Sequence, residues 1–237
     1  MSNTLEDQFY IRQKGIIDKL LLSSVTIIGC GASGSCIGVL VGKLGCPVIE
    51  LWDGDTVEIH NLPNQYYPND SIGKNKATVL KDVIELFTPK ELMPSVIAHD
   101  EMYIDNDVIG DVVFLCADGL DNRREIYRKI QTHKNVNWLI DTRMGAEYYE
   151  VHTVNLNDRD DKKRYYETLT GDDIPLPCTA RSVIYNVMSM ASLAVTIYTK
   201  IVRQGERDHV PKKLSCDLLG VYLNKEYREN ESPIISL

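Results

Sequence analysis

One run of six residues near the start of the chain restricts its fold more than any other feature. The run, GCGASG at positions 29–34, follows a short apolar segment and precedes a segment rich in small residues. A G-x-G-x-x-G run between a strand and a helix lets the backbone turn tightly and lie close to a phosphate, which the free N–H groups and the dipole of the helix N-terminus attract. The sequence therefore predicts a strand–loop–helix unit in which Gly29, Gly31 and Gly34 bind an anionic ligand.

Apolar and amphipathic segments alternate along most of the chain. Short apolar runs predict strands at Val25–Ile28, Val48–Trp52, 92–98, 111–117, 138–140, 148–154 and 214–223. Longer segments predict helices at 5–22, 33–44, 73–87, 121–131 and 183–202. Such alternation is typical of right-handed crossovers and an α/β fold. We expect a Rossmann-like, mostly parallel sheet with helices on both faces and an antiparallel extension near the C-terminus.

The length favours a single domain for residues 1–237. Within it we expect an N-terminal helix at 1–22, a nucleotide-binding core at 25–154, a mobile loop at 155–180, and a C-terminal helix and strand at 181–237. The loop prediction rests on a polar, turn-rich composition, and the charge run at 158–164 indicates a solvated segment.

Charge and cysteine usage narrow the class of protein. The chain has 34 acidic and 26 basic residues and a net charge of −8, which argues against a nucleic-acid partner. It shows neither a signal peptide nor an uninterrupted apolar span, so we expect a cytoplasmic protein with no membrane partner. None of its six cysteines forms a C-x-x-C pair, so we predict reduced thiols and no zinc.

The residue at the end of the second predicted strand indicates what the glycine run binds. Asp53 can accept hydrogen bonds from ribose hydroxyls, which is typical of nicotinamide and flavin dinucleotide sites. The alternative is a glycine turn with no ligand. A second carboxylate at Asp55, the segment NLPNQ at 61–65 and the segment GKNKA at 73–77 exceed what a dehydrogenase needs. They suit a site that cleaves ATP between its α- and β-phosphates, where charge must be screened in the transition state.

Taken together, these segments resemble the ThiF/MoeB/ubiquitin-activating superfamily of adenylyltransferases. That superfamily activates the C-terminal carboxylate of ubiquitin-like or sulfur-carrier proteins. The resemblance runs from about residue 10 to residue 202, and its motifs are weak singly but specific in this order. The matching positions are Arg12 and Gln13, the 29–34 run, Asp53 and Asp55, Asn61 and Gln65, Gly73 and Lys76, and Asp118 with Arg123.

The resemblance implies ATP and Mg²⁺ as cofactors and gives roles to single residues. Asp53 would bind ribose, Lys76 would contact the phosphates, and Asp118 would hold Mg²⁺. Arg12 would reach in from the second subunit of a homodimer. Further nucleotide contacts would come from Asp55, Asn61 and Gln65.

Each of two assignments has a plain alternative. Lys76 is equally well read as a solvated lysine on a helix face. For Asp118 the alternative is the N-cap of the following helix, a role that can coexist with metal binding. Asp121 competes with it for the metal, but Asp118 is preferred because it ends the strand and an arginine follows it at the superfamily's spacing.

A cysteine before the last helix is a candidate nucleophile. Cys178 stands beside Arg181 at the predicted helix N-terminus, where a thiol tends to have a lowered pKa. Its thiolate can attack an acyl-adenylate to give a thioester, as the matching cysteine does in relatives that the sequence resembles. The alternative is an inert, buried cysteine.

One position departs from the superfamily pattern. Asn64 stands where an arginine is common, so phosphate binding is weakened unless Lys74 or Arg143 supplies the charge. We predict an adenylyltransferase acting on a small ubiquitin-like or sulfur-carrier protein. The alternatives are an NAD(P)-dependent oxidoreductase, a non-catalytic partner subunit of the ubiquitin-activating type, and activation of a small-molecule or tRNA-borne carboxylate.

Overall fold

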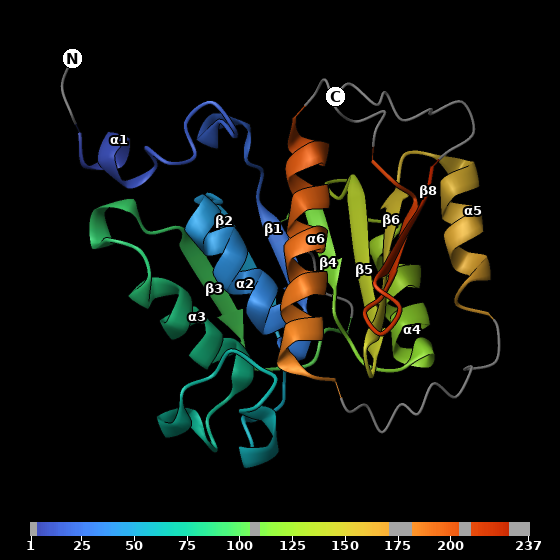
Figure 1. The fold of residues 1–237 in the computed structure, drawn as a ribbon, viewed down its shortest axis with the longest axis horizontal. Helices are drawn as coiled ribbons and strands as arrows, with labels where there is room; N and C mark the ends of the chain where they lie inside the picture. The colour runs from blue at the N-terminus through green and yellow to red at the C-terminus, as the bar shows by residue number, and fades with distance from the viewer. Residues whose placement is uncertain (1–3, 105–109, 171–181, 204–209, 228–237) are drawn as a thin grey trace.

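An eight-stranded sheet organises the described part of the chain (Figure 1). The computed structural model describes residues 4–104, 110–170, 182–203 and 210–227. The strand order is β3-β2-β1-β4-β5-β6-β7-β8. The strands are β1 (Val25–Ile28), β2 (Val48–Trp52), β3 (Ser95–His99), β4 (Val112–Leu115), β5 (Trp138–Gly145), β6 (Tyr148–Asn155), β7 (Lys213–Asp217) and β8 (Tyr222–Glu226).

The sheet is parallel from β3 to β5 and antiparallel from β5 to β8. This confirms the predicted Rossmann-like architecture and its antiparallel extension. The register aligns Ile28 with both Trp52 and Leu115, the last residues of β2 and β4. The loops that follow β1, β2 and β4 therefore leave the sheet at one edge, where ligands bind in open α/β sheets.

Helices cover both faces of the sheet, as predicted (Figure 1). On one face α2, α3 and α6 pack over the larger core cluster, and on the other α4 and α5 pack over the smaller one. None of the helices in the described ranges is long and apolar enough to cross a membrane. The α-helices are α1 (Leu5–Phe9), α2 (Ala32–Leu44), α3 (Lys76–Leu86), α4 (Leu120–Ile130), α5 (Arg159–Glu167) and α6 (Ile184–Val202). Short 3₁₀-helices lie at Lys19–Leu21, Ile59–Asn61, Asn69–Ser71 and Lys90–Leu92.

The N-terminal segment differs from the prediction of one helix up to residue 22. Helix α1 begins after the Thr4 capping box and ends at Phe9, and turns follow it. Gly15 adopts a positive φ of 83°, which interrupts a helix. Ile16 and Leu20 are largely exposed. The segment thus lacks a continuous apolar stripe facing the core, which is what stabilises a surface helix.

The charge run at 158–164 is also not the solvated loop that we predicted, because α5 forms there. The Asp158 carboxylate caps this helix by accepting hydrogen bonds from the backbone N–H groups of Asp160 and Asp161. Tyr165 is fully buried and packs edge-on against Tyr127 of α4, with ring centroids 4.8 Å apart. One aromatic anchor and a strong cap hold a helix whose composition is almost entirely polar.

The last predicted strand proves to be a hairpin. Strands β7 and β8 pair antiparallel, and the turn between them places Val221 at a positive φ of 56°. All five β8 residues are exposed. This edge hairpin completes the antiparallel half of the sheet.

Candidate functional site

A cavity of about 660 Å³ opens at the carboxyl ends of β1, β2 and β4. Its size is that of a small-molecule or cofactor site. One part of its wall is apolar, formed by Ile28, Trp52, Met102, Tyr103 and Ile126. The other part is polar and contains most of the predicted site residues: Gly29, Gly31, Asp53, Asp55, Gln65, Lys76 and Asp118.

The three glycines of the 29–34 loop serve different purposes. Gly29 has a positive φ of 92°, and a Cβ there would lie 2.7 Å from the carbonyl oxygen of Cys116. A Cβ on Gly34 would lie 1.9 Å from the carbonyl oxygen of Gly29. Packing thus requires glycine at both positions. A Cβ on Gly31 would meet no atom within 4 Å, although Gly31 lines the cavity. Of the three, only Gly31 has open space on its Cβ side, which lets a ligand lie close to the backbone.

Asp53 connects the glycine loop to the segment after β2. Its Oδ2 accepts a hydrogen bond of 2.6 Å from the N–H of Cys30, and its Oδ1 accepts one of 2.8 Å from the N–H of Asp55. Burial raises the pKa of the Asp53 carboxyl, and these two backbone donors oppose the shift. Asp53 is 6% exposed and lines the cavity. This position suits the predicted contact with ribose.

Lys76 is buried beside the cavity rather than solvated on a helix face. It is the first residue of α3, whose N-cap Asn75 accepts a hydrogen bond from Thr78 and donates one of 2.7 Å to the carbonyl oxygen of Asp53. Its Nζ lies 3.0 Å from Oδ2 of Asp55. The residue is 8% exposed and lines the cavity, so its ammonium group faces the polar wall.

Asp118 follows β4 and lies exposed on the cavity wall. It does not cap α4, because the N-cap of that helix is Gly119. Asp121, the competing metal candidate, forms an ion pair of 2.8 Å with Arg124 and does not line the cavity. Within the described ranges, no three His, Cys, Asp or Glu side chains gather closely enough to hold a metal ion by themselves.

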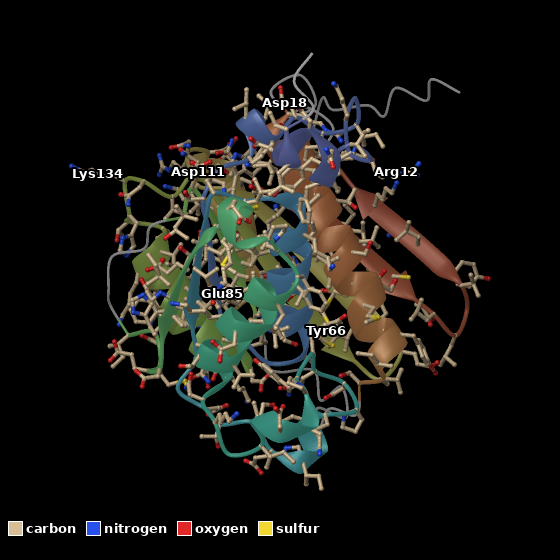
Figure 2. The ribbon with its side chains drawn as sticks, turned by 90° about the vertical axis from the view of Figure 1, so that its left-hand side faces the viewer. Arg12, Asp18, Tyr66, Glu85, Asp111 and Lys134 are labelled. Carbon is tan, nitrogen blue, oxygen red and sulfur yellow. The ribbon has the colours of Figure 1, made fainter. Side chains whose placement is uncertain are left out.

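Besides Gly34, two predicted residues in the described ranges, Asn61 and Arg12, do not line the cavity. Asn61 accepts a hydrogen bond of 2.9 Å from the N–H of Glu58 and shapes the loop without lining the cavity. Arg12 lies at the opposite end of the molecule from the 53–75 segment (Figure 2). It therefore cannot reach the cavity of its own chain. Cys178 lies outside the described residues.

The cation missing at Asn64 is not replaced by either residue that the sequence suggested. The Asn64 amide lines the cavity and donates a hydrogen bond of 3.2 Å to the hydroxyl of Ser182, just before α6. Neither Lys74 nor Arg143 lines the cavity. Arg143 instead binds Asp141 and the Thr168 carbonyl and hydroxyl groups.

Behind the cavity lies a buried charge cluster, which we call the Asp141 network. The fully buried Asp141 carboxylate accepts hydrogen bonds from Arg123, from Arg143 at 2.7 Å and from Tyr165 at 2.9 Å. Burial alone would raise the pKa of Asp141, but the two guanidinium groups outweigh it and lower the pKa. Arg123 also lines the cavity, so the network fixes one of its walls.

The apolar wall was not predicted from the sequence. Trp52 stacks on His99 with ring centroids 3.6 Å apart, and Tyr103 packs edge-on against the same indole. Trp52 directly precedes Asp53, and that adjacency is the signal that could have placed it here. Met102 and Tyr103 follow β3 and carried no comparable signal.

Comparisons with known proteins agree with this architecture. A family model described as the ThiF family matches residues 6–226. The crystal structure of PaaA has a TM-score of 0.74 at 20% identity, with 94% of this chain and 73% of PaaA covered. E. coli MccB with ATP has a TM-score of 0.67 at 18% identity, with 92% and 67% covered. E. coli MccB with AMPCPP and MccA has a TM-score of 0.65 at 18% identity, with the same coverage. Comparison with curated proteins gave no match.

Proposed function

Because the chain belongs to the ThiF family, we propose that it is an ATP-dependent adenylyltransferase that activates the C-terminal carboxylate of a small ubiquitin-like or sulfur-carrier protein. A carboxylate oxygen attacks the α-phosphorus of ATP, the bond to the bridging oxygen breaks, and pyrophosphate leaves. The product is an acyl-adenylate. A thiolate, from Cys178 or from an external acceptor, then attacks the acyl carbon and releases AMP.

The observation that carries the proposal is the composition of one cavity wall. An open glycine backbone at Gly31, a carboxylate at Asp53, a buried lysine at Lys76 and a second carboxylate at Asp118 all line the same cavity. MccB, which shares the fold, has been solved with ATP and also with AMPCPP together with MccA. A nucleotide and a second molecule thus have a precedent on this fold.

In the proposed complex the apolar part of the wall contacts the base, and the polar part contacts the ribose and the phosphates. The base packs against Trp52 and Tyr103, and Asp53 accepts hydrogen bonds from the ribose. The phosphates meet the N–H groups at the start of α2 and the ammonium group of Lys76. The ion pair between Lys76 and Asp55 holds this ammonium group in place before ATP binds.

Asp118 fits a magnesium ion, because Mg²⁺ is commonly held by one or two carboxylates together with substrate phosphates. When bound there, Mg²⁺ supplies positive charge to the phosphates. The cavity needs that charge, because Arg123, its other cation among the described residues, is already paired with Asp141. Arg12 of a second subunit supplies a further cation in the proposed homodimer.

Nucleotide binding and pyrophosphate exchange test the proposal. Small proteins ending in Gly-Gly serve as candidate carboxylate substrates, and the fluorescence of Trp52 reports binding. Lys76→Ala and Asp118→Ala should each lower ATP–pyrophosphate exchange by about 10²–10³. Lys81→Ala, on the same helix but away from the cavity, should retain wild-type exchange. Unchanged exchange in both cavity variants would contradict the assignment, and a fluorescence response to NADH but not to ATP would favour the oxidoreductase.

Mixing two inactive variants tests the second subunit. Arg12→Ala and Lys76→Ala should each be inactive alone. A mixed dimer contains one site with both wild-type residues, so exchange should recover to about a quarter of the wild-type rate per chain if the subunits pair at random. No recovery, with dimers confirmed by light scattering, would show that Arg12 does not act across the interface.

A further inference from the structure

A tyrosine outside the cavity connects the two segments that form its phosphate-binding side. The hydroxyl of Tyr67 lies 2.5 Å from the carbonyl oxygen of Cys30 in the glycine loop and 3.3 Å from the carbonyl oxygen of Lys76 at the start of α3. Tyr67 is 7% exposed, and its ring packs in the larger core cluster. It does not line the cavity, so any effect that it has on a nucleotide acts through these two residues.

Both backbone polar groups of Cys30 are hydrogen-bonded to side chains in this arrangement. Its N–H donates to Asp53 at 2.6 Å, and its carbonyl oxygen accepts from Tyr67. The peptide units on either side of Gly31 carry the N–H groups that face a phosphate, and their orientation depends on how Cys30 is held. Two partners on one residue leave the loop little freedom to rotate.

The hydroxyl group matters separately from the ring. Burial raises the pKa of Tyr67 well above its usual range, so the group remains protonated and can donate. Its oxygen lies within hydrogen-bond distance of two carbonyl oxygens, one in the glycine loop and one at the start of α3. The ring would still fill its place in the core without the hydroxyl, but the loop and the helix would lose this connection.

On the basis of the proposed function, we propose that Tyr67 is a positioning residue for nucleotide binding. Its hydroxyl fixes the backbone of the glycine loop relative to the backbone of Lys76. It thereby sets the relative positions of the loop N–H groups and the Lys76 ammonium group that bind the phosphates. Small displacements of such groups have large effects, because a misplacement of about 1 Å can cost about 10²-fold in rate. The part of the site that binds the base does not depend on this connection.

The variant Tyr67→Phe removes the hydroxyl and keeps the ring. Its matched control is Tyr198→Phe, which removes the hydroxyl of another buried tyrosine; that hydroxyl donates to the Ser23 carbonyl oxygen at 2.7 Å, remote from the cavity. Binding of adenosine, ADP and ATP is followed by Trp52 fluorescence. Hydrogen exchange of the 30–33 and 76–79 amides is followed in the protein without nucleotide.

We expect Tyr67→Phe to raise the Kd for ADP and ATP about tenfold, the effect of losing one hydrogen bond, and to leave adenosine within about twofold. Loop amides should exchange faster in Tyr67→Phe only. Wild-type affinity for ADP and ATP would overturn the proposal, and so would an equal loss for adenosine, which indicates general destabilisation. If the wild-type protein binds no nucleotide, the proposed function fails. Hydrogen exchange then decides the positioning role, and unchanged exchange overturns it.

Discussion

The two glycines at positions 31 and 34 should respond in opposite ways to the same substitution. A methyl group on Gly34 would lie 1.9 Å from a backbone oxygen, more than 1 Å closer than any Cβ contact tolerates. The obstructing atom is the Gly29 carbonyl, which cannot rotate away as a side chain would. Overpacking of this kind costs about 1–3 kcal/mol. We expect Gly34→Ala to lower the free energy of unfolding by about 2 kcal/mol, even after the gain in helix propensity.

Gly31→Ala should leave stability unchanged and weaken nucleotide binding. Gly31 has an ordinary φ of −72°, and an added Cβ meets nothing within 4 Å, so the free energy of unfolding should change by less than about 0.5 kcal/mol. The new methyl group, however, occupies the space through which a phosphate approaches the loop. Losing one hydrogen bond to a charged phosphate costs about 1.5–3 kcal/mol, which raises the Kd for ATP by about 10–100-fold.

Urea denaturation and fluorescence titration of both variants measure these two effects. Ala32→Gly, one position further along, is a control for altered backbone freedom in the loop. If Gly31→Ala binds ATP as tightly as the wild type, the phosphates do not approach this loop and our assignment of the polar wall is wrong. If Gly34→Ala is as stable as the wild type, the loop can shift freely and the role of packing is overstated.

Two further predictions concern charge. Asp141→Asn leaves two buried guanidinium groups without their carboxylate, so it should lower the free energy of unfolding by about 3–5 kcal/mol, measured with urea at pH 7. The control Asp121→Asn removes an exposed ion pair and should lower it by less than about 1 kcal/mol. Because the folded pKa of Asp141 is lowered, the stabilisation that it gives is complete above its unfolded pKa of about 4 and is lost as the pH falls through the folded pKa. The wild type should therefore lose stability below pH 4 more steeply than Asp141→Asn, and parallel profiles would contradict this. Finally, Mg²⁺ should tighten ATP binding and leave adenosine binding unchanged, since the polar wall holds three carboxylates and its one ammonium group, that of Lys76, is already paired with Asp55; equal ATP affinity in EDTA would refute this.

The sequence predicted those parts of the site whose residues lie close together in the chain and form a recognisable motif. The glycine run and Asp53 belong to one strand–loop–helix–strand segment, and the register of β1 with β2 brings them together. The two helices that we misjudged show the limit of such patterns. A helix was expected at 5–22 from apolar content, but most of its apolar side chains stay exposed, whereas α5 was missed because a single buried tyrosine anchors it.

The Asp141 network and the Tyr67 hydroxyl lie beyond any such pattern, because each also joins segments that are distant in the chain. Asp141 meets Arg123 only because α4 crosses back over β4 and β5, and Tyr67 meets Cys30 across 37 positions. Asp141 and Tyr67 themselves do not line the cavity. They hold the groups that do. In this fold most residues of the polar wall follow a local sequence pattern, but the residues that fix their geometry are selected by tertiary packing. That difference explains why Asn64 is compatible with a formed site. A comparison of motifs shows only that Asn64 lacks the positive charge of an arginine. The structure shows that its amide donates a hydrogen bond to Ser182, just before α6.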